Sequence, residues 1–467
     1  MKLSRLVYAL IAAAGLAAVG VSQDATAKDR KAVAAEQTAT ANTVTLTVAL
    51  YPYVPRIDQF KQAITNAWAE VQPDVALNFV SSDDWDGGYS SNPKSDYDIF
   101  IFDGMFFEYF KEQGYLSTIP ASSITDPDDL LAYARNGVTD GSNYYAIPFL
   151  GCSNVLFYNK SNTELAEADT LTKVADVLGS FTYTSQEPPD RRGLMLDMAG
   201  GTTNATLYLD VAYNQTGVYP LPQPAADDLS QDAIDTMTKL IGLASFWNVT
   251  LDPPMAYGRS VWFNSGYGKA FVGFTESMSV MSEQTRSDIA FKIMPFSDND
   301  FGELFYADVI GVNAQTEQRD LAIELANLIA TTDVFVASTG KTSTEPPQFL
   351  MATRKSAFET LAEQNPIYDQ MYALITDNEP LMFKLDKNAR TWVDSVKQPI
   401  KTASRKDFTG GCDFESASFI SNQSQAAAQC DAACDDHDGW SGQWTNVAPA
   451  APPGKSVCGC NSCPVPG

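Results

Sequence analysis

Strand-like and helix-like segments alternate along most of this chain, and that alternation is the strongest constraint on its fold. The pattern predicts strands at residues 44–49, 75–80 and 97–102. Between the first two, the spacing of Phe60, Ile64 and Trp68 predicts a helix. The run at 97–102 is continuously apolar, which is typical of a strand buried in a parallel sheet. Strands that alternate with helices predict an α/β fold.

The chain has 467 residues, which is enough for two or three domains. Apolar spacing predicts further helices at residues 226–245, 318–330 and 355–376.

The first 27 residues have the pattern of a signal peptide. Lys2 and Arg5 precede an apolar run at 6–21, and Ala25-Thr26-Ala27 matches a cleavage site. We therefore expect a secreted or periplasmic chain without a membrane anchor, in which residues 28–42 form a linker.

The formal net charge is −26. Such a chain repels phosphate backbones, so the charge argues against nucleic-acid binding. Inside a cleft, the same charge favours cationic small molecules. The acidity is equally compatible with a role in solubility alone.

Cysteines are distributed very unevenly. Six lie in the last 56 residues: Cys412, Cys430, Cys434, Cys458, Cys460 and Cys463. In an oxidising compartment, these six predict three disulfides that staple a small domain, and their connectivity stays open. Cys152 is left over, as either an inert buried thiol or a reactive one.

The only histidine is His437, which lies near the C-terminus. Its position excludes Cys-His and Ser-His-Asp sites from the rest of the chain. If Cys152 is a nucleophile, its base must therefore be a carboxylate or a lysine. A buried glutamate with a raised pKa fits that role.

Residues 43–400 resemble the extracellular solute-binding proteins. The resemblance rests on the order of "QPDVALNF", "DYDIFIFDGMFFEYFKEQGYLSTI" and "YYAIPFLGCSNVLFYNK". It implies a two-lobed α/β domain of the type II periplasmic-binding-protein class. In that family the last segment crosses from the first lobe to the second, and a ligand is held in the cleft between them.

Six segments also resemble the thiaminase I (thiamine pyridinylase) family in order and spacing: "LYPYVP", "WDGGYS", "IFDG", "IPFLGCSNVLFYNK", "FVGFTESM" and "FYADV". The resemblance implies that Cys152 is the nucleophile and that Glu276 is the catalytic glutamate. It implies that Asp103 and Asp308 bind the pyrimidine. It also implies aromatic cleft residues at Tyr51, Tyr53, Tyr89, Tyr257 and Tyr306.

This resemblance implies a secreted enzyme that takes thiamine as its substrate and needs no cofactor. The second substrate would be a nucleophile such as an amine, a pyridine or a thiol, and the enzyme would be a monomer. Two other functions stay open. One is a non-catalytic solute-binding protein for thiamine or another cation, and the other is a sugar-binding adhesion protein.

The C-terminal residues 412–467, after an expected linker at 401–411, resemble the mannan-binding lectin repeat through "GWSGQW" and "SVCGC". The resemblance implies mannan-type glycans as partners and sugar contacts from Trp440, Gln443 and Trp444. The insertion "APAAPP" departs from the pattern. The alternatives are a structural cap whose tryptophans form its core, and a zinc site at the cysteines and His437.

Overall fold

The structure, a computed structural model, describes residues 44–179, 191–196, 201–246, 257–299, 301–404, 413–437, 439–446, 451 and 454–460. The predicted signal peptide at 1–27 and the predicted linker at 28–42 lie outside the described residues. So do most of the predicted linker at 401–411 and the cysteines Cys412 and Cys463.

A mixed sheet forms the core of the first lobe. In spatial order, its strands are β14 (Met351–Ala352), β7 (Ile147–Cys152), β13 (Leu304–Val312), β3 (Ile99–Asp103), β1 (Val44–Ala49) and β2 (Val75–Phe79), and β15 (Leu381–Met382) also pairs with β13. The strands β1 and β3 are parallel, as the apolar run predicts. The strand β13 is antiparallel to both β3 and β7, so the sheet is not purely parallel.

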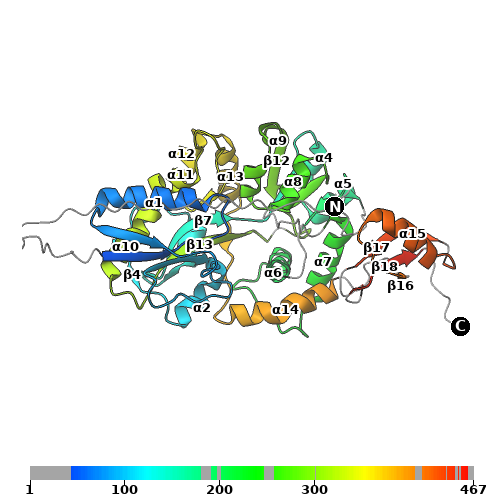
Figure 1. Ribbon diagram of the computed structural model, residues 1–467, viewed down its shortest axis with the longest axis horizontal. Helices are drawn as coiled ribbons and strands as arrows, with labels where there is room; N and C mark the ends of the chain where they lie inside the picture. Colours follow the sequence, from blue (N-terminus) through cyan, green and yellow to red (C-terminus); the bar gives the residue numbers. More distant parts are fainter. Residues whose placement is uncertain are drawn as a thin grey trace, which may run out of the picture. The chain divides into compact units, whose positions relative to one another are not determined.

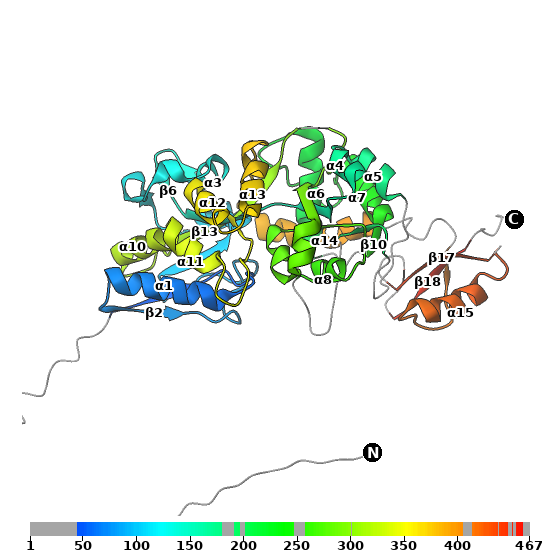
Figure 2. The same cartoon turned by 90° about the horizontal axis from the view of Figure 1, so that it is seen from above.

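Helices cover both faces of this sheet (Figure 1), where α1 (Ile57–Val71) and α2 (Phe107–Glu112) lie on opposite sides. The predicted residues Phe60, Ile64 and Trp68 form the buried stripe of α1. The other helices of this lobe are η1 (Gly104–Phe106), η2 (Ala121–Ser123), η3 (Pro127–Asp129), α3 (Ala132–Gly137), α10 (Arg319–Ile329), α11 (Thr332–Thr339), α12 (Lys355–Ala362) and α13 (Ile367–Thr376). Figure 2 shows α1, α10 and α11 side by side.

The helix expected at 355–376 is in fact two helices, α12 and α13. Pro366 stands at the break, as the N-cap of α13. A proline inside a helix would remove a backbone hydrogen bond and clash with the preceding turn, so the chain stops and restarts there. The lobe also carries a small antiparallel sheet of β4 (Ile119–Pro120), β6 (Asn143–Tyr144) and β5 (Thr139–Asp140).

The second lobe contains a five-stranded sheet. Its strands, in spatial order, are β10 (Ala244–Phe246), β9 (Leu194–Met195), β11 (Ala270–Gly273), β8 (Val155–Asn159) and β12 (Ile289–Ile293). Its helices are α4 (Thr163–Glu167), α5 (Leu171–Leu178), α6 (Thr202–Thr216), α7 (Gln231–Leu243), α8 (Gly258–Asn264), η4 (Thr275–Val280) and α9 (Glu283–Asp288). The helix expected at 226–245 is α7, which begins after Ser230 because that side chain accepts a hydrogen bond from the Ala233 N–H.

Two connecting segments join the lobes. One leads from β7 into β8, and the other leads from β12 into β13. The Ser153 hydroxyl of the first segment donates to the backbone oxygen of Leu304, at the end of the second, at 3.2 Å. The helix α14 (Ala389–Ala403) contacts η1 of the first lobe and α6 of the second (Figure 1). Its Trp392 indole donates to the Pro224 oxygen at 2.7 Å.

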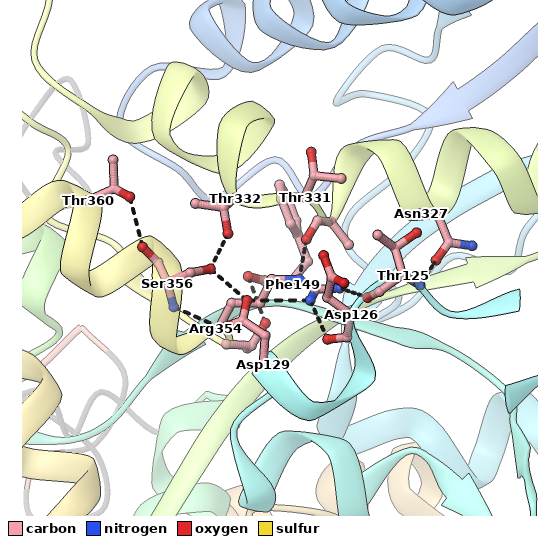
Figure 3. A network of polar contacts seen from close by, with 12 residues as sticks. Thr125, Asp126, Asp129, Phe149, Asn327, Thr331, Thr332, Arg354, Ser356 and Thr360 are labelled. Carbon is pink, nitrogen blue, oxygen red and sulfur yellow. Dashed lines mark hydrogen bonds and ion pairs between the residues drawn. The ribbon is translucent and has the colours of Figure 1, made fainter. Parts of the chain in front are cut away.

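A buried arginine ties together the elements behind β7 (Figure 3). The Arg354 guanidinium donates to the backbone oxygens of Ala330, Asp126 and Thr125 at 2.6, 2.9 and 2.8 Å, and it lies 3.5 Å from a carboxylate oxygen of Asp129. The hydroxyl of Thr353, the preceding residue, donates to the Phe149 oxygen of β7. This network therefore fixes the strand that ends at Cys152.

The cysteine-rich tail has a hydrophobic cluster of its own. A three-stranded antiparallel sheet of β16 (Asp413–Glu415), β18 (Val457–Cys460) and β17 (Trp440–Thr445) packs against α15 (Gln423–Ala433). Disulfides join Cys430 to Cys458 and Cys434 to Cys460. These four sulfurs are therefore not available as zinc ligands, which rules out the zinc site that used them.

Among the residues that the structure describes, we find no single helix with the length and apolar character that a bilayer span requires. The helices α10 and α11 meet this criterion only as a pair, and that pair is bent by 61°.

Candidate active site

One cavity of about 600 Å³ brings together every main-domain site residue that the sequence predicts. Its lining includes Tyr51, Tyr53, Tyr89, Asp103, Cys152, Tyr257, Glu276, Tyr306 and Asp308. The first four and Asp308 come from the first lobe, whereas Tyr257 and Glu276 come from the second. The motifs that carry these residues are far apart in sequence, so only the fold unites them.

Strand register places four of these side chains on one face of the first sheet. In the antiparallel pairing, Tyr306 of β13 lies opposite Cys152 of β7, and Asp308 lies opposite Asp103 of β3. Residues directly opposite each other in such a pair point to the same face, and so do residues two apart along one strand. The pairing of the three strands is therefore sufficient to bring the thiol of Cys152, the phenol of Tyr306 and the carboxyls of Asp103 and Asp308 together.

Cys152 is the last residue of β7 and is the one free cysteine among the described residues. Burial raises the pKa of its thiol well above the usual value, and the nearby carboxyls of Glu276 and Asp308 raise it further. A thiol in this environment holds its proton at neutral pH. It needs a base, or a positive charge close by, to become a nucleophile.

Glu276 follows β11 and lies in η4, with 6% of its surface exposed. Burial raises the pKa of its carboxyl to about 7. Its Oε2 atom has no hydrogen-bond partner among the described residues. A buried carboxyl with a pKa near neutrality and a free oxygen is suited to accept and return a proton.

Asp103 and Asp308 form a pair of buried carboxyls. Asp103 accepts hydrogen bonds from the Met105 N–H at 2.9 Å and from the Tyr89 hydroxyl at 2.7 Å. Burial raises the pKa of both carboxyls, and Asp103 raises that of Asp308 further. Two buried carboxyls this close do not both ionise readily unless a cation or a set of N–H donors arrives between them.

The tyrosines give the cavity aromatic walls. Tyr53 packs edge-to-face on Tyr51 and on Tyr89, with ring centroids 5.5 and 5.7 Å away. Because 56% of its surface is exposed, Tyr53 lies at the cavity mouth. A Cβ atom on Gly87, whose φ is +74°, would lie 2.6 Å from the Tyr51 ring. The glycine in the predicted "WDGGYS" motif therefore leaves room for Tyr51.

The other two predicted tyrosines lie deeper in the cavity walls. Tyr306 stacks on Phe383 at 4.5 Å, and Tyr257 is the residue before α8. Burial raises the pKa of the Tyr257 phenol, and the neighbouring Glu276 raises it further.

A positively charged side chain from α14 fixes the loop that carries Tyr89. The Arg390 guanidinium donates to the backbone oxygen of Gly88 at 2.9 Å and also binds the Ser91 oxygen. It stacks over the Tyr109 ring at 4.4 Å. Sequence analysis did not single out Arg390, because its partners are distant in sequence.

Asp210 is a second residue that sequence reasoning missed. It lies on α6 with 6% of its surface exposed, and it accepts hydrogen bonds from Tyr306 at 2.7 Å and from Asn154 at 2.8 Å. Burial raises the pKa of its carboxyl to about 8. The one available signal was a single carboxylate inside the apolar stretch "LYLDVAY".

The tail residues have a different environment. Trp444 is fully buried in the tail core, and its indole N–H donates to the Gln423 side chain at 2.7 Å. This burial contradicts the expectation that Trp444 offers an exposed face to a sugar. Trp440 is partly buried against the same core, and the side chain of Gln443 lies outside the described residues.

No group of three or more His, Cys, Asp or Glu side chains in the described ranges is arranged to hold a metal ion.

Comparison with known proteins identifies close relatives. Residues 153–297 match the model of the thiaminase-1 domain family. The chain is 33% identical to thiaminase-1 of Paenibacillus thiaminolyticus over 365 residues, which are 77% of this chain and 88% of that protein.

Solved structures agree with this result. The structure of Clostridium botulinum thiaminase I in complex with thiamin matches with a TM-score of 0.73 and 33% identity, over 77% of this chain and all of that one. Maltose-bound MalE3 of T. maritima matches with a TM-score of 0.56 at 14% identity, over 78% of this chain and 99% of that one. The second match concerns the fold alone, which is that of the solute-binding proteins.

Proposed function

We propose that this chain, which belongs to the thiaminase I family, cleaves thiamine and transfers its pyrimidinylmethyl group to a second nucleophile. In this role it is a thiamine pyridinylase. The observation that most strongly supports the proposal is that one cavity unites the Cys152 thiol, the Glu276 carboxyl, whose Oε2 atom no described residue binds, the carboxyl pair and the tyrosines.

Substrate binding follows from the charge and shape of the cavity. Thiamine joins an aminopyrimidine to a cationic thiazolium through a methylene group. Buried carboxyls attract the cation, and tyrosine faces bind it by cation–π contact. One carboxyl of the Asp103–Asp308 pair accepts a hydrogen bond from the amino group of the pyrimidine, and the other, in its protonated form, donates to a ring nitrogen, so the flat ring lies beside Cys152.

Activation of the thiol requires Glu276. Its carboxylate takes the proton of Cys152. The thiolate sulfur then forms a bond to the pyrimidine ring carbon next to nitrogen. The positive charge of bound thiamine opposes the effect of the surrounding carboxyls, which raise the thiol pKa in the empty cavity. The nucleophile is therefore activated when the substrate is present.

The ring nitrogen receives the electron pair displaced by the thiolate, and the carboxyl pair stabilises the charge that develops there. This pair then forms a double bond from the ring to the methylene while the bond from the methylene to the thiazolium nitrogen breaks. The thiazole leaves as a neutral molecule with the two electrons of the broken bond. Glu276 then releases the Cys152 proton to solvent. A second nucleophile loses its proton to the ionised Glu276 and attacks the methylene. Expulsion of Cys152 restores the aromatic pyrimidine and the free enzyme.

The test is a turnover assay. Purified protein is incubated with thiamine and aniline, and free thiazole is followed by chromatography. We expect thiazole to be released by the natural protein. Cys152→Ser should still bind thiamine, measured by calorimetry, but release no thiazole.

Absence of thiazole with the natural protein would refute the enzyme and, together with tight thiamine binding, would favour the non-catalytic solute-binding alternative. Turnover by Cys152→Ser at the natural rate would remove Cys152 from the mechanism. A matched control is Ser153→Ala, because Ser153 neighbours Cys152 but bonds to the Leu304 backbone instead of lining the cavity.

We also propose that the chain is exported through the leader at residues 1–27. For the tail, we propose a disulfide-stapled module that binds mannan-type glycans. This second role is supported by Trp440, which is only partly covered by the tail core.

A further inference from the structure

The buried carboxyl of Asp210 lies behind the cavity wall, and it is not among the cavity-lining residues. Among the described residues, both of its hydrogen bonds reach one oxygen, Oδ2. The donors are Tyr306, which lies opposite Cys152, and Asn154, two residues after it. The Oδ2 atom of Asp210 therefore fixes two side chains near the Cys152 sulfur: Tyr306, on the neighbouring strand, and Asn154, further along the chain.

Asp210 also lines a cavity of about 10 Å³, which is close to the volume of about 10–15 Å³ that accepts one water. Asn214, one helical turn along α6, lines the same cavity. Its side-chain oxygen Oδ1 is buried and has no hydrogen-bond partner among the described residues. A buried acceptor of this kind requires a donor.

No lysine or arginine is among the residues that line this small cavity. Among the described residues, the titratable groups that act on or are affected by Asp210 are Tyr306 from β13 and Cys152 from β7, and Tyr213 and Glu303 line the small cavity with it. None of these four is a cation. A buried carboxyl without a cationic partner is more stable in its neutral form.

We propose that Asp210 is a positioning residue that works in its protonated form, with Oδ2 accepting from Tyr306 and Asn154 and with the proton on Oδ1. That proton is donated to one buried water, which in turn donates to Oδ1 of Asn214. Every polar group in this network then has a partner. The raised pKa of Asp210, about 8, agrees with this protonation state.

The network affects the reaction in two ways. Because the Tyr306 hydrogen is donated to Asp210, the phenol oxygen can only accept hydrogen bonds from the cavity side, for example from an N–H group of a substrate. A charged Asp210 would raise the pKa of the Cys152 thiol. A neutral Asp210 keeps Tyr306 and Asn154 in place without opposing formation of the thiolate.

The inference rests on the proposed function, and two variants test it. Asp210→Leu leaves the donors on Tyr306 and Asn154 unpaired, so we expect kcat/KM to fall by about tenfold or more. Asp210→Asn copies the neutral acid, because its oxygen accepts and its NH₂ group donates toward Asn214. We expect its kcat/KM at pH 7 to lie within about threefold of the natural value.

The pH profiles separate this role from a purely structural one. Natural enzyme should lose activity as the pH rises above about 8, when Asp210 ionises, and Asp210→Asn should not show that decline. Asp308→Asn is the matched control, because it removes a carboxyl that faces the substrate and should be impaired at every pH. An Asp210→Asn variant as impaired as Asp210→Leu would overturn the proposal, as would full activity of Asp210→Leu.

A second measurement does not depend on turnover. The infrared difference spectrum between natural protein and Asp210→Asn at pH 7 should contain the carbonyl band of a protonated carboxylic acid. A carboxylate band in its place would contradict the inference. Failure of the thiaminase assay would leave this spectrum unaffected, so the two proposals can fail separately.

Discussion

Glu276 combines burial with one oxygen that no described residue satisfies. A surface glutamate would be a carboxylate throughout the neutral range and a poor proton acceptor. Burial brings the carboxyl pKa to about 7, where it can take a proton from Cys152 and later release it. The proposed role of Glu276 as a base therefore depends on its burial and on the absence, among the described residues, of a partner for Oε2.

A pH dependence follows for catalysis. The base must be ionised, so kcat/KM should rise with pH through about 7, and Glu276→Gln should remove this rise and reduce kcat/KM by about 100-fold or more at pH 8. Steady-state rates with thiamine and aniline measure both effects. A kcat/KM that is flat between about pH 5 and 8 would show that another group is the base.

Glu276→Gln should lower activity but raise stability. The carboxyl pKa is higher in the folded protein than in the unfolded chain, so its contribution is fully present below about pH 4.5 and is lost as the pH rises through about 7. The shift corresponds to about 3 kcal/mol. At pH 8, Glu276→Gln should therefore melt at a higher temperature than natural protein, and thermal unfolding followed by circular dichroism measures this.

Among the elements, β7 carries the proposed nucleophile, and the network around Arg354 fixes this strand (Figure 3). Only 4% of the Arg354 side chain is exposed. Its removal would leave the backbone oxygens of Ala330, Asp126 and Thr125 unsatisfied in a buried place. Unsatisfied buried groups cost more than the hydrogen bonds themselves contribute.

We expect Arg354→Met to lower the free energy of unfolding by about 3–5 kcal/mol. Arg319→Met is the matched control, because Arg319 has 46% of its side chain exposed. Exposed ion pairs contribute about 1 kcal/mol or less, so this variant should be nearly neutral. Urea unfolding measures both variants, and equal losses in the two would mean that the network does not stabilise the lobe.

The sequence pattern predicted those helices and strands whose apolar spacing lies within one continuous segment. Phe60, Ile64 and Trp68 predicted α1 because a helix stripe repeats within one segment. The antiparallel position of β13 was not predictable, because its neighbours are set by where the chain returns from the second lobe. The same reason explains Asp210, whose partners Tyr306 and Asn154 lie on other elements.

In the whole molecule, the two lobes share one hydrophobic cluster, and the tail has another that is separate from it. The last helix of the main domain, α14, ends at Ala403, before the tail begins. Because none of the described tail residues lines the large cavity, the proposed chemistry and the proposed glycan binding are expected to reside in different parts of the chain.

A chain that ends at Ser404 should keep kcat/KM for thiamine within about twofold, since its core and site are complete. The full chain should be retained on immobilised mannan, and the shortened chain should not. Trp440→Ala in the full chain should reduce retention. Equal retention of full and shortened chains would exclude the glycan role, and loss of turnover in the shortened chain would show that the tail supports the active site.

The pairing of Cys152 with Tyr306 has a consequence for how this fold can be rearranged. The second lobe leaves the first after Cys152 and rejoins it just before Tyr306, so its two ends are about 5 Å apart. In a chimaera of two homologues, this segment would be exchanged as one piece, and the retained first lobe and α14 would have to match it where α14 contacts α6. Because this segment carries Glu276 and the first lobe carries Cys152, each exchange would combine the proposed proton acceptor of one parent with the proposed nucleophile of the other.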